Sequence, residues 1–258
     1  MPHQLINMEV IKDYIVDKLG NDVKFMPLTK VEAINQQAGT IRVFKEQYIG
    51  DAEVVAPGQP IPLADFVQSA VNVDIIKRSK ALKFTEEDLL SMAGNPAQRI
   101  ADQLLRSLNN GLDKALRDEL AGITGAMVVD ATAVGKITVD VVADALQKFG
   151  ENQGSSYLFV NPATLTAMRK EEGFALKSAE NGINIVGEIY GANVVLSESV
   201  PAGEAYIIKE GALELYLRKE PTLKQGPDIL TEQEVFTGNV YFAAHLADES
   251  KAVKIDLA

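Results

Sequence analysis

The chain has 258 residues, of which 47% are hydrophobic and 24% are charged, the balance of an ordinary folded protein with one large domain or two small ones. It contains no cysteine, which excludes disulfides, thiolate metal sites and cysteine nucleophiles. The formal net charge of −11 argues against a protein built to grip nucleic acid, because phosphate binding requires clustered lysine and arginine.

The first predicted element is a short helix over residues 6–19, with Gly20 as its end. Three acidic residues among its apolar ones exclude a secretory signal. The longest apolar run, Leu120 to Val129, is about half the length of a membrane helix, so we expect a soluble protein with no membrane contact. Residues 21–37 follow no regular period, and 1–37 is interpreted as an N-terminal arm.

Residues 38–84 predict a long two-stranded ribbon, the first strand beginning at Thr40 and the second running from about Phe66 to Phe84. Residues 50–65 between the strands contain three prolines and two glycines, which exclude a helix or a central strand. A basic run lies within the second strand and is interpreted as one solvated strand face: Lys77, Arg78, Lys80 and Lys83.

The outer part of this ribbon is rich in apolar side chains, although a two-stranded ribbon cannot bury its own. The ribbon therefore lies either on its own domain or on another copy of the chain, and the proline-rich apolar tip favours the second. The residues predicted at this interface between subunits are Phe44, Tyr48, Ile49, Val54, Val55, Pro60, Ile61, Leu63 and Phe66.

Two helices are predicted next, in a segment that we assign to residues 85–136. Thr85 begins a short one, and Asn95–Pro96 begins a second that continues to Ala121, about 39 Å long. Its apolar residues recur every four positions, so the stripe winds around the helix and meets different partners along it. This spine-helix core consists of Ile100, Leu104, Leu108, Leu112, Leu116 and Leu120.

Strands and helices alternate over residues 137–220, which indicates a separate α/β-like lobe. Thr138 begins a helix that Gly150 ends, and Asn161 followed by Pro162 begins another. Four strands are predicted at 157–160, 193–197, 205–209 and 213–217. Residues 221–258 return to extended segments.

No constellation of catalytic, cofactor-binding or metal-binding residues is found. The run DATAVGKIT lacks both the first glycine and the final serine or threonine of a phosphate-binding loop. The densest carboxylate groups, Glu171–Glu172 and 86–88, are explained as a solvated surface and a helix start. Of the two histidines, His245 lies in an extended segment and is interpreted as a packed or interface residue.

Five runs, in this order, resemble the tailed-bacteriophage major capsid protein family. They are YIGDAEVVAPGQPIP, KRSKALKFTEEDLL, NPAQRIADQLLRSLNNGLDKALRDEL, YLFVNPATLTAM and VVLSESVPAGEAYIIKEGALEL. The resemblance implies an α+β fold with an N-terminal arm (1–37), an E-loop hairpin (38–84) and a P domain with a long spine helix (85–136). An A domain (137–220) and a return to the P domain (221–258) complete it.

The resemblance also implies a function in assembly. The E-loop would lie across the P domain of a neighbour, the A domains would meet in pentamers and hexamers, and the arm would reach under an adjacent subunit. The expected partners are other copies of the chain, a separate scaffold protein, a portal, and double-stranded DNA enclosed without sequence-specific binding. The location implied is the virion capsid, after synthesis in the host cytoplasm.

Two alternatives stay open at this point. An encapsulin, the shell of a bacterial nanocompartment, has the same architecture. A soluble α/β enzyme using carboxylates is the alternative from another class, because an acidic chain always contains some pair of carboxylates.

Overall fold

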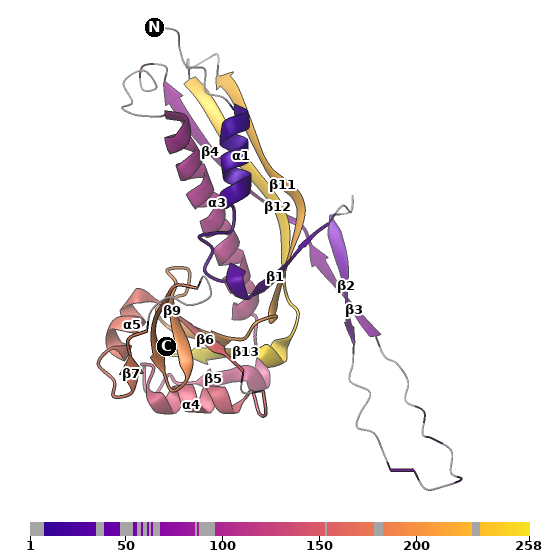
Figure 1. Ribbon diagram of the computed structural model, residues 1–258, viewed down its shortest axis with the longest axis vertical. Coiled ribbons are helices and arrows are strands. Elements are labelled where there is room, and N and C mark those ends of the chain that lie inside the picture. The colour runs from indigo at the N-terminus through magenta and orange to yellow at the C-terminus, as the bar shows by residue number, and fades with distance from the viewer. Residues whose placement is uncertain are drawn as a thin grey trace.

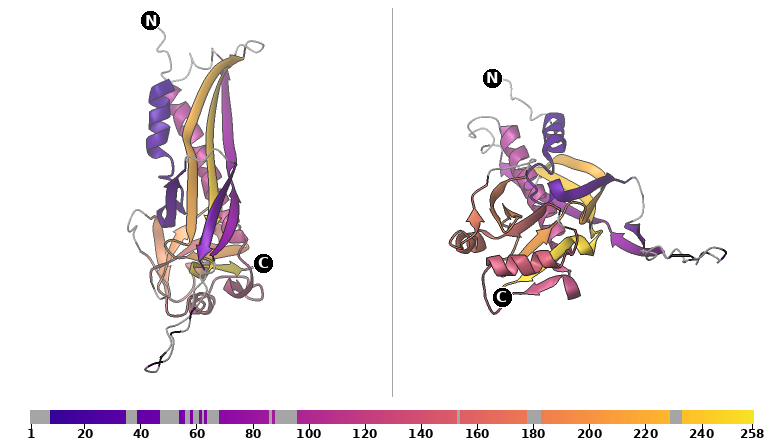
Figure 2. Two further views of the ribbon diagram at one scale, coloured as in Figure 1. Left: turned by 90° about the vertical axis from the view of Figure 1, so that its right-hand side faces the viewer. Right: turned by 60° about the horizontal axis from the view of Figure 1, so that its bottom comes forward.

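In the computed structural model, the described strands form two β-sheets and a separate two-stranded ribbon (Figure 1). It describes residues 8–34, 39–46, 54–55, 58, 61, 63, 68–85, 87, 96–152, 154–177, 183–228 and 233–258. The four-stranded sheet runs along the long axis, and the seven-stranded sheet lies at one end of it (Figure 2). The short helix predicted after Thr85 lies almost wholly outside the described residues.

The four-stranded sheet has the order β1-β11-β12-β4. Only β1 is parallel to its neighbour, and the other pairs are antiparallel. Helix α3 packs on β12 and β4, and helix α1 packs beside α3 and on β11. The bounds are β1 Thr29–Ala33, β4 Ile76–Thr85, β11 Leu213–Asp228, β12 Gln233–Leu246, α1 Met8–Lys18, α3 Pro96–Ala121 and the 3₁₀ helix η1 Met26–Leu28.

Helix α3 begins and ends where the sequence predicted, and its winding apolar stripe lies in the core. All six predicted stripe residues are at most 2% exposed: Ile100, Leu104, Leu108, Leu112, Leu116 and Leu120. They share one hydrophobic cluster with Phe236, Val240 and Phe242 of β12 and with Ile11 and Ile15 of α1. Because complete burial of each such side chain contributes about 2 kcal/mol, this helix holds the sheet and α1 together.

The seven-stranded sheet has the order β5-β13-β10-β6-β9-β8-β7 and encloses a second core beneath α4 and α5. Thr138 Oγ1 accepts a hydrogen bond from Val141 N at 3.4 Å, and Asn161 Oδ1 accepts one from Ala163 N at 3.0 Å, which confirms both predicted helix starts. The bounds are β5 Val128–Asp130, β6 Ser156–Val160, β7 Phe174–Ala175, β8 Ile185–Ile189, β9 Ala192–Leu196, β10 Glu204–Ile208, β13 Ala252–Asp256, α4 Val139–Gln147, α5 Pro162–Met168 and the 3₁₀ helices η2 Gly125–Met127 and η3 Glu249–Lys251.

The predicted ribbon over 38–84 is wrong in its second half. Only the strand β3 (Gln68–Asp74) pairs with β2 (Thr40–Glu46). The residues that follow form β4, which pairs with β12 along its whole length. Since an alternating pattern does not specify the partner of a strand, the sequence alone could not divide this run.

The N-terminal region also differs from its prediction. Residues 21–37 were expected to be irregular, but η1 and β1 lie within them, and β1 extends the four-stranded sheet through β11. Val23, Phe25 and Leu28 are buried in the core around α3. The described part of the predicted arm, residues 8–34, therefore packs on the chain's own body.

Strands from outside residues 137–220 complete the seven-stranded sheet. β5 comes from the predicted spine segment and β13 from the predicted return segment. In the other direction, β11 begins at Leu213 and belongs to the four-stranded sheet. None of the described helices is long and apolar enough to cross a membrane.

Candidate assembly interface

The β2–β3 hairpin projects sideways from the body (Figure 1, Figure 2). Its strands pair antiparallel from Thr40 opposite Asp74 to Glu46 opposite Gln68. At the base, Ile75 N donates a hydrogen bond to Gly39 O at 2.7 Å, and Thr40 Oγ1 donates one to Asp74 Oδ1 at 3.0 Å. The hairpin is thus closed where it leaves the body.

The inner end of the hairpin is anchored on the four-stranded sheet. Ile41 is 4% exposed and clusters with Tyr216 of β11 and Ala243 of β12. Partly buried apolar residues surround this contact: Ile34, Val43, Val73 and Ile75. The body therefore fixes the direction in which the hairpin leaves it.

Polar contacts of Tyr216 and its neighbours add to this apolar anchor. The Tyr216 hydroxyl donates a hydrogen bond to the Glu214 carboxylate. Burial, followed by this carboxylate, raises the pKa of Tyr216 well above its ordinary value. Lys30 Nζ lies 3.8 Å from Glu214 Oε1. The phenol is therefore protonated, and available as a hydrogen-bond donor, throughout the physiological pH range.

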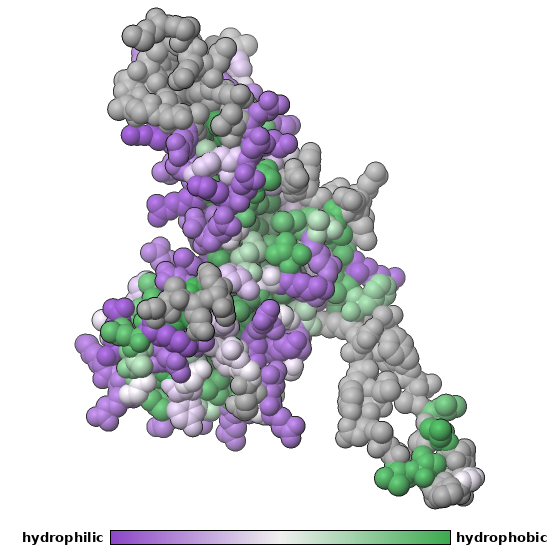
Figure 3. All heavy atoms as spheres, viewed as in Figure 1, coloured by the Kyte–Doolittle hydropathy of each residue, from purple (hydrophilic) through white to green (hydrophobic). Residues whose placement is uncertain are grey.

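The outer part of the hairpin carries apolar side chains that the described part of the chain leaves exposed. Of the predicted interface residues, Phe44 is 56% exposed, Val54 103%, Ile61 76%, Leu63 98% and Val55 37%. Hydrophobic side chains beyond the two strands stand clear of both sheets (Figure 3). The remaining predicted interface residues lie outside the described residues: Tyr48, Ile49, Pro60 and Phe66.

Two buried polar residues of α3 hold the segment that follows α1, and the sequence analysis missed both. Asn109 Oδ1 accepts a hydrogen bond from Gly20 N at 3.0 Å. Asp113 Oδ1 accepts hydrogen bonds from Lys24 N at 2.9 Å and Phe25 N at 3.4 Å, and its Oδ2 accepts one from Ser197 Oγ at 3.2 Å. Asp113 thus joins α3 to the N-terminal segment and to the end of β9.

Replacing Asp113 by alanine is expected to destabilise the subunit by about 1–3 kcal/mol, because the N–H groups of Lys24 and Phe25 then lose their acceptor. The matched control is Asp118→Ala on the same helix, where the carboxylate is 53% exposed and lies 3.1 Å from Arg117 Nη2; such pairs contribute about 0–1 kcal/mol. Thermal unfolding of both variants measures the difference. Equal melting temperatures for the two variants would contradict the role of Asp113.

The carboxylates and the histidine singled out from the sequence do not come together in the described residues. Within them, no three histidine or acidic side chains gather closely enough to hold a metal ion. Glu171, one of the dense carboxylates, pairs with Lys136 Nζ at 2.5 Å, and Glu172 is exposed. His245 is buried on β12, opposite Glu214 of β11. What the geometry offers is surface for protein contacts.

Solved structures with the same fold are shells. The capsid of a native GTA particle matches with a TM-score of 0.72 and 14% identity, over 92% of this chain and 90% of that chain. The holo-SrpI encapsulin complex from Synechococcus elongatus PCC 7942 matches with a TM-score of 0.64 and 12% identity, over 90% and 85%. At these identities the likeness shows the fold alone. It defines the α+β fold of shell-forming capsid proteins, as predicted.

Comparisons of sequence give the family. Residues 68–255 match the family described as phage capsid protein. The major capsid protein of Staphylococcus phage phiMR11 is 29% identical over 256 residues, which cover 96% of this chain and 92% of that protein. The chain belongs to the phage capsid protein family. It is a structural, shell-forming protein and not an enzyme, so the alternative of a soluble α/β enzyme using carboxylates is wrong. The encapsulin alternative is supported only by the similarity in fold.

Proposed function

We propose that this chain is the repeating subunit of an icosahedral phage shell, assembled through pentamers and hexamers, in which the β2–β3 hairpin of one copy lies across the four-stranded sheet of a neighbour. The observation that carries the proposal is a hairpin anchored at Ile41 whose outer apolar residues, Val54 and Leu63 among them, are fully exposed. Burying such surface gains about 25 cal/mol per Å², and this gain becomes available when another copy covers it.

The proposal assigns a part to each region of the chain. The hairpin is the E-loop, the four-stranded sheet with α1 and α3 is the P domain, and the seven-stranded sheet with α4 and α5 is the A domain. Every copy both gives a hairpin and receives one, so modest contacts add up over a closed shell. A separate scaffold protein, a portal and enclosed double-stranded DNA are the further partners, and the host cytoplasm is where the subunit is made.

Negative-stain electron microscopy of the purified chain, together with size-exclusion chromatography, tests this proposal. We expect hollow icosahedral particles, or rings of five or six subunits, because the exposed apolar side chains favour contact between copies. A chain that stays monomeric at high concentration, both alone and with its scaffold protein, would overturn the proposal.

A further inference from the structure

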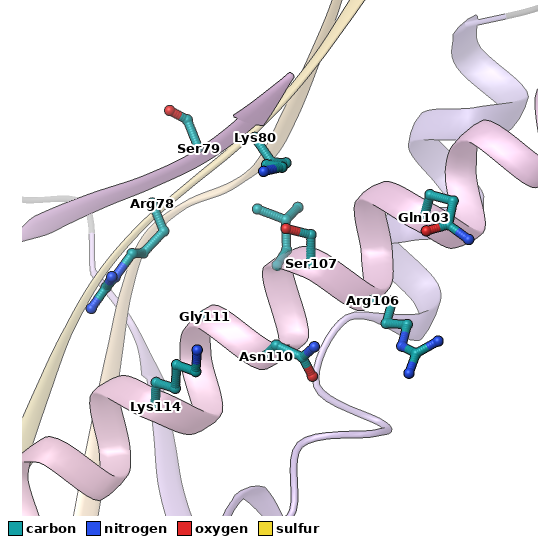
Figure 4. A pocket seen from close by; sticks show the side chains of 10 residues that line it. Arg78, Ser79, Lys80, Gln103, Arg106, Ser107, Asn110, Gly111 and Lys114 are labelled. Atoms are coloured by element: carbon teal, nitrogen blue, oxygen red, sulfur yellow. The ribbon is translucent and has the colours of Figure 1, made fainter. Parts of the chain in front are cut away.

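A groove of about 580 Å³ lies between α3 and the edge strand β4. Figure 4 shows its strand side, with Arg78 and Lys80, and its helix side, with Ser107 and Lys114; Arg106 extends outward from the helix at the rim. The lining residues are all polar except Leu108 and Gly111.

The strand side of the groove is polar at positions that would otherwise belong to the core. Lys80 lies opposite Gly238 of β12, and Arg78 lies opposite Val240. Gly238 faces α3, since a Cβ added to it would lie 3.4 Å from Leu108 Cδ1. Residues directly opposite each other in antiparallel strands share a face, so Arg78 and Lys80 are on the side that faces α3.

Further along the same strand face the pattern returns to apolar residues. Leu82 and Phe84 pack against the core around α3. Arg78 instead extends along the helix, where a Cβ added to Gly111 would lie 3.8 Å from Arg78 Cγ. The sheet and the helix therefore separate at Arg78 and Lys80, and the groove results from the packing of β4 against α3.

The charge of the groove is opposite to that of the chain. Its lining contains Arg78, Lys80, Arg106 and Lys114 and no carboxylate, whereas the whole chain has a formal net charge of −11. Within the described part of the chain, none of these four cations forms an ion pair. Four like charges repel one another, so an anionic ligand would relieve the repulsion.

Protection of the sheet edge explains only part of this cluster. Lysine and arginine on an edge strand discourage pairing with another strand, which accounts for Arg78 and Lys80. It does not account for Arg106 and Lys114, because α3 presents no strand edge. Lys114 lies at the groove with Arg78 and Lys80, and Arg106 extends from its rim (Figure 4), so an anionic ligand in the groove would be near all four cations.

We infer that this groove binds the phosphodiester backbone of nucleic acid without reading its sequence. Arginine, lysine, serine, asparagine and glutamine are the side chains that contact phosphate oxygens, and the groove has all five: Arg78, Lys80, Ser107, Asn110 and Gln103 among its lining. The groove follows α3 from Gln103 to Lys114, about 17 Å at 1.5 Å per residue. A linear polyanion matches this elongated shape.

The inference deepens the proposed function, on whose enclosed DNA it rests, by assigning a contact surface for that DNA; the binding itself depends neither on the hairpin nor on shell geometry. The test uses the purified, unassembled full chain, so failure to form shells would not affect it. The variant Arg106→Gln/Lys114→Gln removes the two helix cations, which are exposed and outside the core. The matched control is Arg169→Gln/Lys170→Gln, an exposed pair after α5 that loses the same charge.

The probe is a fluorescein-labelled DNA duplex of mixed sequence, about 20 base pairs long, titrated by anisotropy from about 50 to 200 mM salt. The wild-type chain is expected to bind it, and the groove variant to bind about tenfold more weakly, with a salt slope smaller by about 2. The control variant should match the wild type within about twofold.

Three results would overturn the inference. The first is no binding by the wild-type chain at the lowest salt concentration, and the second is an equal loss in the groove and control variants. The third is preferential binding of a labelled polyglutamate peptide of matched charge, which would assign the groove to an acidic polypeptide instead.

Discussion

A chain without residues 50–65 is expected to fold and stay in solution but to form no shells. The hairpin is anchored by Ile41, which lies in β2 and packs on Tyr216 and Ala243. The deletion lies beyond β2 and before β3, so the body and the anchor remain. What is lost is the apolar surface that another copy would cover, including Val54 and Leu63.

Circular dichroism, thermal unfolding and electron microscopy of this variant separate folding from assembly. A milder variant, Val54→Asp/Leu63→Asp, keeps the chain length and charges the same surface. Both side chains are fully exposed, so the free energy of unfolding should change by no more than about 0.5 kcal/mol, while shells are lost. Shells of normal size from either variant would show that the hairpin does not join subunits.

Leu112→Asp is expected to abolish folding. The Leu112 side chain is completely buried at the middle of α3. Its removal alone costs about 2–5 kcal/mol, and burial of an unpaired carboxyl group adds several kcal/mol. A protein of this kind has a total stability of about 5–15 kcal/mol, so the sum removes most or all of it. The same result is expected for Leu108→Asp, since Leu108 is 2% exposed.

Two controls identify the cause. Asn110→Asp places the same carboxylate on the exposed side of α3, and Leu112→Met keeps an apolar side chain of similar volume, which cores tolerate at a cost below about 1.5 kcal/mol. Soluble yield and thermal unfolding measure all four variants. Unchanged melting of Leu112→Asp or Leu108→Asp would contradict the position of the spine helix in the core.

Local signals were sufficient for the helices and insufficient for the sheets. Asn95–Pro96 and the four-residue apolar spacing gave both ends of α3, because capping and periodicity depend on neighbours in sequence. The partner of β4 is β12, more than 140 positions away, and no local pattern specifies that pairing. The same limit concealed β1, which pairs with β11, and β5, which pairs with β13.

The hairpin tip and the basic groove were also predictable only in part. The excess of apolar residues around the hairpin tip was visible in the sequence, but the anchor of Ile41 on Tyr216 required the fold. The basic run on β4 was interpreted as one solvated strand face. The structure divides it between two faces, and Arg78 and Lys80 line one groove together with cations of α3 that come more than 25 positions later. A groove between two elements cannot be predicted from sequence until the packing of one element against the other is known.

The strand order has a consequence for synthesis on the ribosome. Residues 233–256 supply β12, the neighbour that joins β4 to the four-stranded sheet, and β13, the neighbour that joins β5 to the seven-stranded sheet. Because translation proceeds from the N-terminus, neither sheet can be completed until these residues have emerged. A chain interrupted before residue 233 lacks both β12 and β13, so the last-made strands decide whether either sheet of the subunit can close.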